Sequence, residues 1–367
     1  MANNSCTCIG LMSGTSLDGL DIVYCRFWFE NSKWEYELLK TNCMEYPYDL
    51  FSKLKNAKSL SGEELVRLDA DYGKWIADVV NTFILREGIK PDFIASHGHT
   101  VFHQPENSIT LQVGSGNEIF ASCKVPVVCN FRQLDVALGG QGAPLVPIGD
   151  ELLFGEYDFC LNLGGIANIS TNRSGQRIAY DIVPVNIILN HQAERAGMSY
   201  DRGGELAAKG EIIEKLILQL ESLSYYKTPF PKSLGSEWID SNILSIKEFC
   251  ADPPENILRT YVEHITNRLS SDIIQLSSNS SSQTRKILVT GGGAWNTYLI
   301  HTLKKKLGKQ FDVLVPKEDL VNYKEGLIFA FLGLLRIKNQ NNCLASVTGA
   351  SRDNSGGIII SDQNIIL

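Results

Sequence analysis

The sequence predicts an α/β protein of two domains, and three observations support this. Its 367 residues, 44% of them hydrophobic, are enough to form two ordinary cores. Strand-like and helix-like segments alternate along the chain, which is the pattern of α/β folds. A strand, a glycine-containing turn and a second strand occur twice, beginning at Cys8 and again at Phe159. One small module is therefore excluded.

Charge and composition exclude several other classes. The 34 basic and 41 acidic residues give a net charge of −7, and the basic residues are spread out apart from Lys304 to Lys306, which disfavours nucleic-acid binding. No apolar run approaches the roughly 20 residues that span a bilayer. The opening MANNSCTC lacks the regions of a secretion signal, so we expect a cytoplasmic protein. The nine cysteines include no CxxC pair, and we expect reduced core thiols.

The first predicted element is a β-hairpin. Its strands are Cys8 to Met12 and Leu20 to Phe29, and Asp18-Gly19 suits the reversal between them. The connecting loop is unusually polar for a plain turn. It is either an oversized hairpin turn or a loop that holds a phosphate.

A long helix is predicted next, from Ser61 to about Glu87. Its apolar residues keep a helical period, Ser61 and Glu64 form a capping box, and Gly88 ends it. A short strand, Phe93 to Ser96, then runs into the polar cluster SHGHTVFHQP. Polar groups at strand ends are where α/β folds place their sites.

The second half of the chain repeats the opening plan. After a glycine-rich segment near an expected domain hinge, Phe159 to Leu163 is a strand, Gly164-Gly165 a turn, and a second strand begins near Ala167. An amphipathic helix from about Pro254 to Leu276 follows. The segment KILVTGGGAWNTYLIHTLKKKLG is then a strand, a triple glycine and a helix, and the amides of such a helix N-terminus favour an anion.

Three glycine-containing turns thus stand at strand ends: Gly14 to Gly19, Gly164-Gly165 and Gly291 to Gly293. Each alone is a common turn, but the series favours a nucleotide held between two lobes. None fits the Walker pattern, which disfavours a P-loop enzyme. GSGNEI at 114 to 119 lacks the last glycine and the acidic anchor of a dinucleotide motif, so a Rossmann dehydrogenase is also disfavoured.

Within the first loop, Ser13, Thr15 and Ser16 are able to donate hydrogen bonds to phosphate oxygens. Asp18 is a candidate ligand for Mg²⁺, directly or through water, and the alternative is that it only makes the turn. Asp181 ends the strand of RIAYDIVPVN and is a candidate general base, the alternative being a turn aspartate.

Three histidines, His97, His99 and His103, lie close together in the sequence. They are either metal ligands or polar contacts to a substrate. No acidic or cysteine partner is near them in the sequence, so substrate contacts are preferred over a zinc site.

A collinear series of motifs resembles the anhydro-N-acetylmuramic acid kinases, of the actin, hexokinase and heat-shock ATPase superfamily, nearly from end to end. The motifs are MSGTSLDGLD (12–21), SHGHTVFHQP (96–105), TLQVG (110–114), NFRQLDVALGGQGAPLVP (130–147), NLGGIANIS (162–170), YDIVPVN (180–186), PKSLGSEW (231–238), VTGGGAWN (289–296) and SVTGASR (346–352).

The resemblance implies a two-lobed actin-like ATPase fold, of the ribonuclease H-like kind, with duplicated mixed five-stranded sheets flanked by helices and an ATP cleft between the lobes. The first lobe is expected at 1–130 with a return at 345–367, and the second at 131–344. The implied enzyme uses ATP and Mg²⁺ to phosphorylate the 6-oxygen of 1,6-anhydro-N-acetylmuramic acid while water opens the anhydro bridge. The product is N-acetylmuramic acid 6-phosphate, for peptidoglycan recycling, and a homodimer is expected.

The resemblance also assigns roles to single positions, with Asp181 as the catalytic base that activates the water. The ATP-binding positions are Ser13, Gly14, Thr15, Ser16, Leu17, Asp18, Gly19, Leu20, Asp21, Gly164, Gly165, Gly291, Gly292, Gly293 and Asn296, with Asp18 also the metal ligand. The sugar-side or supporting positions are His97, His99, Arg132, Asp135 and Glu325.

The chain departs from the family beside the expected base. The family's Asp-Thr-Gly-Pro-Gly-Asn is here 181–186, in which Val183 and Val185 replace two glycines, so a bulkier loop is expected. Asn190 replaces an aspartate and His99 a glutamine. These changes leave two alternatives open: a kinase for another amino sugar, or a non-catalytic nucleotide-binding regulator.

Overall fold

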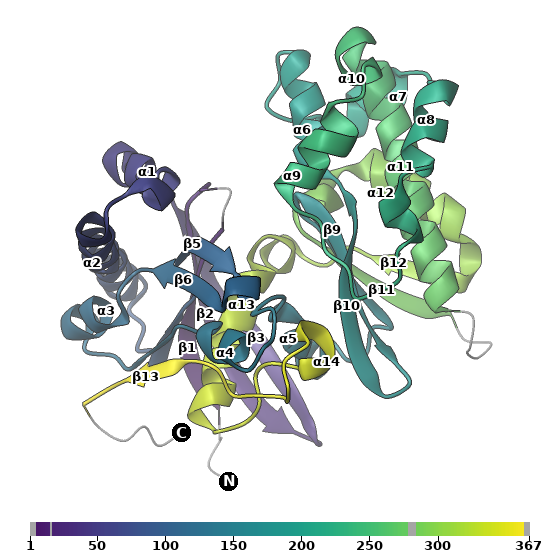
Figure 1. The fold of residues 1–367 in the computed structure, drawn as a ribbon. Helices are drawn as coiled ribbons and strands as arrows, with labels where there is room; N and C mark the ends of the chain where they lie inside the picture. The colour runs from purple at the N-terminus through teal and green to yellow at the C-terminus, as the bar shows by residue number, and fades with distance from the viewer. Residues whose placement is uncertain (1–4, 15–16, 278–283, 363–367) are drawn as a thin grey trace. The chain divides into compact units, whose positions relative to one another are not determined.

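The computed structural model describes residues 5–14, 17–277 and 284–362. The chain forms two compact units, Met1–Leu153 with Tyr323–Leu367, and Phe154–Asn322 (Figure 1). These bounds differ from the expected lobes, because residues 131–153 and 323–344 pack with the first unit. None of the helices in the described ranges combines the length and the apolar character that crossing a membrane requires.

The sheet of the first unit is mixed and has the order β13-β7-β4-β1-β2-β3 in the described part of the chain. Its strands are β1 Cys6–Ser13, β2 Leu20–Glu30, β3 Lys33–Met44, β4 Phe93–Ser96, β7 Val127–Cys129 and β13 Ile358–Ile360. The expected sheet had five strands. The sixth is β13, whose three residues pair antiparallel with β7. A separate hairpin consists of β5 His99–Gln104 and β6 Ile109–Val113.

Helices flank this sheet in the first unit. They are α1 Tyr48–Lys55, α2 Gly62–Glu87, α3 Gly116–Cys123, α4 Gln133–Ala137, α5 Val146–Leu153 and α14 Ala345–Thr348. The predicted ends of α2 are confirmed: Ser61 and Glu64 form the capping box, and Gly88 has a left-handed φ of 63°. The helix α13 Glu318–Ile337 has non-helical angles at Tyr323, where the first unit resumes.

The sheet of the second unit has the order β10-β9-β8-β11-β12 among the described residues, which confirms five strands here. They are β8 Phe159–Leu163, β9 Ile166–Arg173, β10 Gln176–Pro184, β11 Arg285–Thr290 and β12 Phe311–Leu314. Its helices are α6 Asn186–Arg195, α7 Glu205–Lys209, α8 Glu214–Glu221, α9 Ser236–Ile239, α10 Glu248–Ala251, α11 Pro254–Leu276 and α12 Thr297–Leu307.

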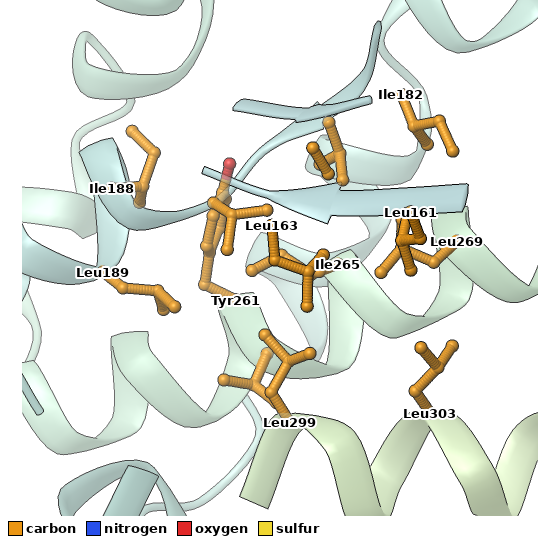
Figure 2. Close-up of a cluster of buried hydrophobic side chains, with 14 of the residues drawn as sticks. Leu161, Leu163, Ile182, Ile188, Leu189, Tyr261, Ile265, Leu269, Leu299 and Leu303 are labelled. Carbon is orange, nitrogen blue, oxygen red and sulfur yellow. The ribbon is translucent and has the colours of Figure 1, made fainter. Parts of the chain in front are cut away.

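The core of the second unit lies between its sheet and α11. Figure 2 shows Tyr261, Ile265 and Leu269 of α11 beside Leu161 and Leu163 of β8. All five side chains are fully buried. The predicted bounds and buried face of this helix are confirmed. Burying each such side chain contributes about 1.5–3 kcal/mol, so this layer holds the strand ends that carry the glycine turns.

The first unit contains one very close contact between a strand and a helix. A Cβ built on Gly10 of β1 would lie 2.0 Å from the carbonyl oxygen of Gly326 in α13. Backbone cannot yield to such an overlap as a flexible side chain does. The helix therefore packs against the centre of the sheet only while position 10 is glycine.

We expect Gly10→Ala to lower the free energy of unfolding by about 2–3 kcal/mol, because overpacking forces strand and helix apart. The measurement is urea denaturation followed by circular dichroism. Gly62→Ala is the matched control, since nothing lies within 4 Å of its added Cβ at the start of α2, and it should change stability by less than about 0.5 kcal/mol. Equal stability of the two variants would contradict the close contact.

Candidate active site

Two of the three predicted glycine turns lie together in the second unit. Strands β8 and β11 are parallel neighbours, with Thr290 opposite Asn162, so both turns leave the same end of the sheet. A Cβ on Gly291 would lie 2.5 Å from Asn162 Oδ1 and 2.8 Å from the carbonyl carbon of Leu163. The φ of Gly291 is also positive, at 81°. Glycine is required at position 291 for both reasons.

The segment after β10 is tied to the Gly164-Gly165 turn by backbone and side-chain hydrogen bonds. Asn186 Nδ2 donates to the carbonyl of Leu163 at 3.1 Å, and Asn186 N donates to Gly164 O at 3.2 Å. Val185 N donates to Gly165 O at 2.8 Å. The first amides of α6 are therefore used by the turn, and the turn fixes where β10 ends.

The helix after the triple glycine is capped by its own side chain. Asn296 Oδ1 accepts from Leu299 N at 2.9 Å, so one of the amides expected to meet an anion is already satisfied. Gly204 lies against this cap, because its added Cβ would be 2.3 Å from Asn296 Oδ1. Asn296 thus joins the start of α12 to the segment around Gly204.

A cavity of about 810 Å³ opens beside these turns within the second unit. The predicted residues Gly292, Gly293 and Asn296 line it, together with Trp295 and Asn190. This volume lies in the range of small-molecule sites.

Sequence reasoning missed one wall of this cavity, the segment Tyr200–Glu205. The paired glycines of DRGGE were the available signal, since Gly203 and Gly204 both have positive φ. Asp201 orders this wall by accepting from Leu206 N at 2.8 Å and from Ala207 N at 2.9 Å. Arg202 adds a cation to the cavity.

Asp181 lies on β10, where a bulge follows it in the pairing with β9. Its Oδ2 accepts from Leu234 N at 2.9 Å, and its carbonyl accepts from the Tyr225 hydroxyl at 2.6 Å. Burial raises the pKa of Asp181, opposed by the hydrogen bond from Leu234. Among the described residues none donates to Oδ1.

The two valines that replace family glycines have their side chains in the core of the second unit. Val183 and Val185 are both 0% exposed and belong to the hydrophobic core of the second unit. The bulkier loop stays a prediction, and the added bulk of both side chains lies in this core. Their methyl groups fill the core, and burying them stabilises the unit.

In the first unit, the root of the polar loop is held by side chains. Ser13 is 2% exposed, and its Oγ lies 2.7 Å from the Tyr46 hydroxyl and 3.1 Å from His99 Nδ1. The Tyr46 hydroxyl also lies 3.0 Å from Gly19 O. Ser13 thus anchors the loop instead of presenting a free hydroxyl to a phosphate.

The chain reverses between Gly14 and Leu20. Leu17 N donates to Gly14 O at 3.3 Å, and positive φ falls on Leu17 and Gly19, not on Asp18. Asp18 is exposed, as a ligand would need. Thr15 and Ser16, the other two expected phosphate donors, lie outside the described residues.

An acidic group lies beside this loop. The pKa of Asp21 is raised to about 6 by burial and by the like charges of Glu325 and Asp18, against a hydrogen bond with Cys43. Carboxylates that repel one another are stabilised by a cation. The described residues contain no group of three or more His, Cys, Asp or Glu side chains placed to hold a metal.

The histidines of SHGHTVFHQP make separate contacts. His97 Nδ1 lies 2.8 Å from Gly98 O, and its Nε2 accepts from Arg132 Nε at 3.0 Å and Nη2 at 2.9 Å. Burial and the Arg132 charge lower the pKa of His97, so the ring is neutral. His103 lies 3.2 Å from Thr110 Oγ1.

Asp135, expected on the sugar side, is fully buried and saturated. Its Oδ2 accepts from Gly142 N at 2.8 Å, and its Oδ1 accepts from Thr348 Oγ1 at 2.9 Å, Asn354 Nδ2 at 2.9 Å and Cys343 Sγ at 3.0 Å. It is therefore a supporting residue that joins the 135–142 segment to the C-terminal return. Its network explains why residues beyond 130 pack with the first unit.

The family model and the curated relatives name one family. The family model described as anhydro-N-acetylmuramic acid kinase matches residues 6–362. Proteins named anhydro-N-acetylmuramic acid kinase are 36% identical in Photobacterium profundum and 33% in Haemophilus influenzae, each match covering 96% of this chain and 97% of the relative. A solved xylulose kinase from Lactobacillus acidophilus is 12% identical, with a TM-score of 0.42 over 89% of each chain.

The environment of His99 generates a pH prediction. Burial lowers its pKa to about 4, below the ordinary value of 6.5, so unfolding lets the ring take up a proton once the pH falls below about 6.5. The contribution of His99 to the free energy of unfolding is therefore fully present above pH 6.5 and decreases as the pH falls towards 4. Replacing His99 by Gln removes the decline.

Between pH 7 and pH 5 the free energy of unfolding of the wild-type protein should fall. In His99→Gln this fall should be smaller by roughly 1–2 kcal/mol. Urea denaturation at the two pH values measures this. His301→Gln, at an exposed position of α12, should follow wild type. A His99→Gln variant that follows wild type as well would show that His99 is not held neutral.

Proposed function

The chain belongs to the anhydro-N-acetylmuramic acid kinase family, and from this premise we propose that Asp181 is the general base of its reaction. The family activity is phosphoryl transfer to the 6-oxygen of 1,6-anhydro-N-acetylmuramic acid with opening of the anhydro bridge, in peptidoglycan recycling. Water attacks the anomeric carbon and gives a proton to the base. The bond from that carbon to the 6-oxygen breaks, and this oxygen takes the γ-phosphoryl group of ATP as ADP leaves.

The observation that supports this proposal most directly is the hydrogen bonding of the Asp181 carboxylate, in which one oxygen accepts a hydrogen bond and the other does not. Leu234 N fixes Oδ2, while none of the described residues donates to Oδ1. A general base must be oriented and still have an oxygen for the water proton. Burial also raises the pKa of Asp181, which makes the carboxylate a stronger base than an exposed aspartate.

We assign the adenosine side of ATP to the cavity of the second unit. Gly292, Gly293 and Asn296 supply close backbone approach, while Tyr200 and Trp295 supply aromatic faces at its wall. Both aromatic side chains are substantially exposed, at 57% and 43%. Aromatic rings beside a nucleotide base contribute stacking.

We assign the phosphates to the loop from Gly14 to Asp21, and Mg²⁺ to Asp18 with support from Asp21. Burial is the main cause of the raised pKa of Asp21, and the like charges of Glu325 and Asp18 add to it, which fits a site that gains a cation. Mg²⁺ is commonly held by one or two carboxylates, waters and phosphate oxygens, and so needs no larger cluster of protein ligands. When bound, it neutralises charge on the transferred phosphoryl group.

On the sugar side we retain His97, His99, Arg132 and Glu325. Burial lowers the pKa of Arg132 to about 10, yet the guanidinium stays charged at neutral pH. It is oriented by His97 and by Gly142 O, which accepts from Nη1 at 2.7 Å. A homodimer and a cytoplasmic location stay predictions.

Replacing Asp181 by Asn should lower kcat by about two to four powers of ten, the usual contribution of a general base. The measurement is coupled ADP release with 1,6-anhydro-N-acetylmuramic acid. ATP affinity should be unchanged, and Asp312→Asn, an exposed substitution on β12, should have wild-type activity. Full activity of Asp181→Asn would remove the residue from the mechanism.

Product mass separates this reaction from the two alternatives. Bridge opening with transfer adds one water and one phosphoryl group to the substrate, whereas a kinase for another amino sugar adds the phosphoryl group alone. A nucleotide-binding regulator gives no phosphorylated sugar. We expect the first mass change, measured by mass spectrometry of the reaction mixture.

Gly291→Ala should weaken ATP binding at least tenfold, because the new Cβ overlaps Asn162 and displaces the turn beside the cavity. Gly175→Ala is a matched control: its φ is also 81°, but nothing lies within 4 Å of its added Cβ. It carries the same backbone strain without the overlap. Titration calorimetry with ATP compares the two, and equal affinities would place the nucleotide elsewhere.

A further inference from the structure

A second cavity in the second unit has no part in the reaction described above. It measures about 340 Å³ and is formed by β9, β10, the 226–232 segment and the last turns of α11. Residues that line it include Arg173, Tyr180, Lys227, Phe230, Lys232 and Asp272. It lies beside the segment that holds Asp181.

The cavity carries an excess of positive charge. Among the described residues that line it, three are cations (Arg173, Lys227 and Lys232) and one, Asp272, is a carboxylate. The guanidinium of Arg173 lies 5.3 Å from the Phe230 ring centre, and Lys232 Nζ lies 5.5 Å from that of Tyr180. Ring faces hold Arg173 and Lys232 in place. Asp272 acts as a counter-charge to Lys232, opposing the lowering of the Lys232 pKa by burial, so the lining residues have one carboxylate for three cations.

The same side chains supply flat apolar surface. The rings of Tyr180 and Phe230 are stacked, with centres 5.5 Å apart and planes 11° from parallel. Burial and the nearby charge of Asp272 raise the pKa of Tyr180, so its hydroxyl stays protonated. Cations above stacked rings, in a cavity near the lower limit for ligand sites, suit a ligand that has one anionic group and a compact body.

We propose that this cavity binds a monosaccharide-sized organic anion, through a carboxylate or phosphate contacted by Arg173 and Lys232. Both groups are bound by guanidinium and ammonium donors in the same way. The body of such a ligand lies against the apolar lining residues Pro229, Phe230 and Leu276.

Hydrogen bonds connect the segment that lines this cavity to Asp181. The effect on catalysis inferred from this connection rests on the proposed role of Asp181 as the base. Lys232 O accepts from Asp181 N at 3.3 Å, Leu234 N donates to Oδ2, and the Tyr225 hydroxyl donates to the Asp181 carbonyl. Lys232 Nζ also lies 4.7 Å from the Tyr225 ring centre. A ligand that holds Lys232 therefore steadies the segment that orients Asp181.

The test uses the full-length protein without ATP, titrated calorimetrically with two probes. N-acetylmuramic acid offers a carboxylate and N-acetylglucosamine 6-phosphate a phosphate, so the stronger ligand identifies the preferred anion. We expect Arg173→Met to weaken binding at least tenfold and Asp272→Asn to strengthen it several-fold, since the latter removes the opposing charge. Lys309→Met, on an exposed lysine of the same unit, should bind as wild type does.

Hydrogen exchange locates the bound probe, and we expect slower exchange in residues 225–234. Absence of binding by both probes, unchanged affinity in Arg173→Met, or unchanged exchange in 225–234 would each overturn the proposal. Asp181→Asn should keep this binding while losing activity. Binding without activity in wild type would refute the proposed function alone, and activity without binding would refute the cavity alone.

Discussion

The close approach of two backbone turns at the end of the second sheet is the constraint on which the rest of this site depends. Gly291 has no room for a side chain because Asn162 and Leu163 lie against it. Asn186 donates to the same Leu163 carbonyl and so ties the exit of β10 to this contact. The cavity that we assign to the nucleotide and the candidate base therefore share one support, made of backbone that glycine allows to pack closely.

In the first unit, glycines also allow close packing, but here a helix lies against a strand. Gly10 and Gly326 let α13 lie directly on the central strand, and Glu325 of this helix is close enough to contribute to the raised pKa of Asp21. The polar loop itself is anchored by buried hydroxyls and by His99, not by glycine contacts alone. This anchoring keeps Asp18 and Asp21 near enough to repel one another. A loop that was not anchored would move them apart.

Much of this could be predicted from the sequence, and the failures have physical causes. The bounds of α2 and α11 follow from periodicity and capping, which are local. The strand β13 was missed because three residues carry too little pattern, and it exists through pairing with β7. The burial of Asp135 was also missed, because it depends on residues that are distant in the chain. Its donors Thr348 and Asn354 are more than 200 residues away.

The loop of the candidate base shows how a change near a site can leave its chemistry in place. A glycine replaced by valine beside a catalytic residue indicates, in the sequence, a site with less space. In the fold, β10 alternates its side chains between two faces, and the bulge after Asp181 sets Val183 into the core. Val185, in the turn before α6, is buried with it. The valines therefore change how the loop is supported, while Leu234 still fixes one carboxylate oxygen of the proposed base. Divergence of this kind adjusts packing, and it is compatible with the same family reaction.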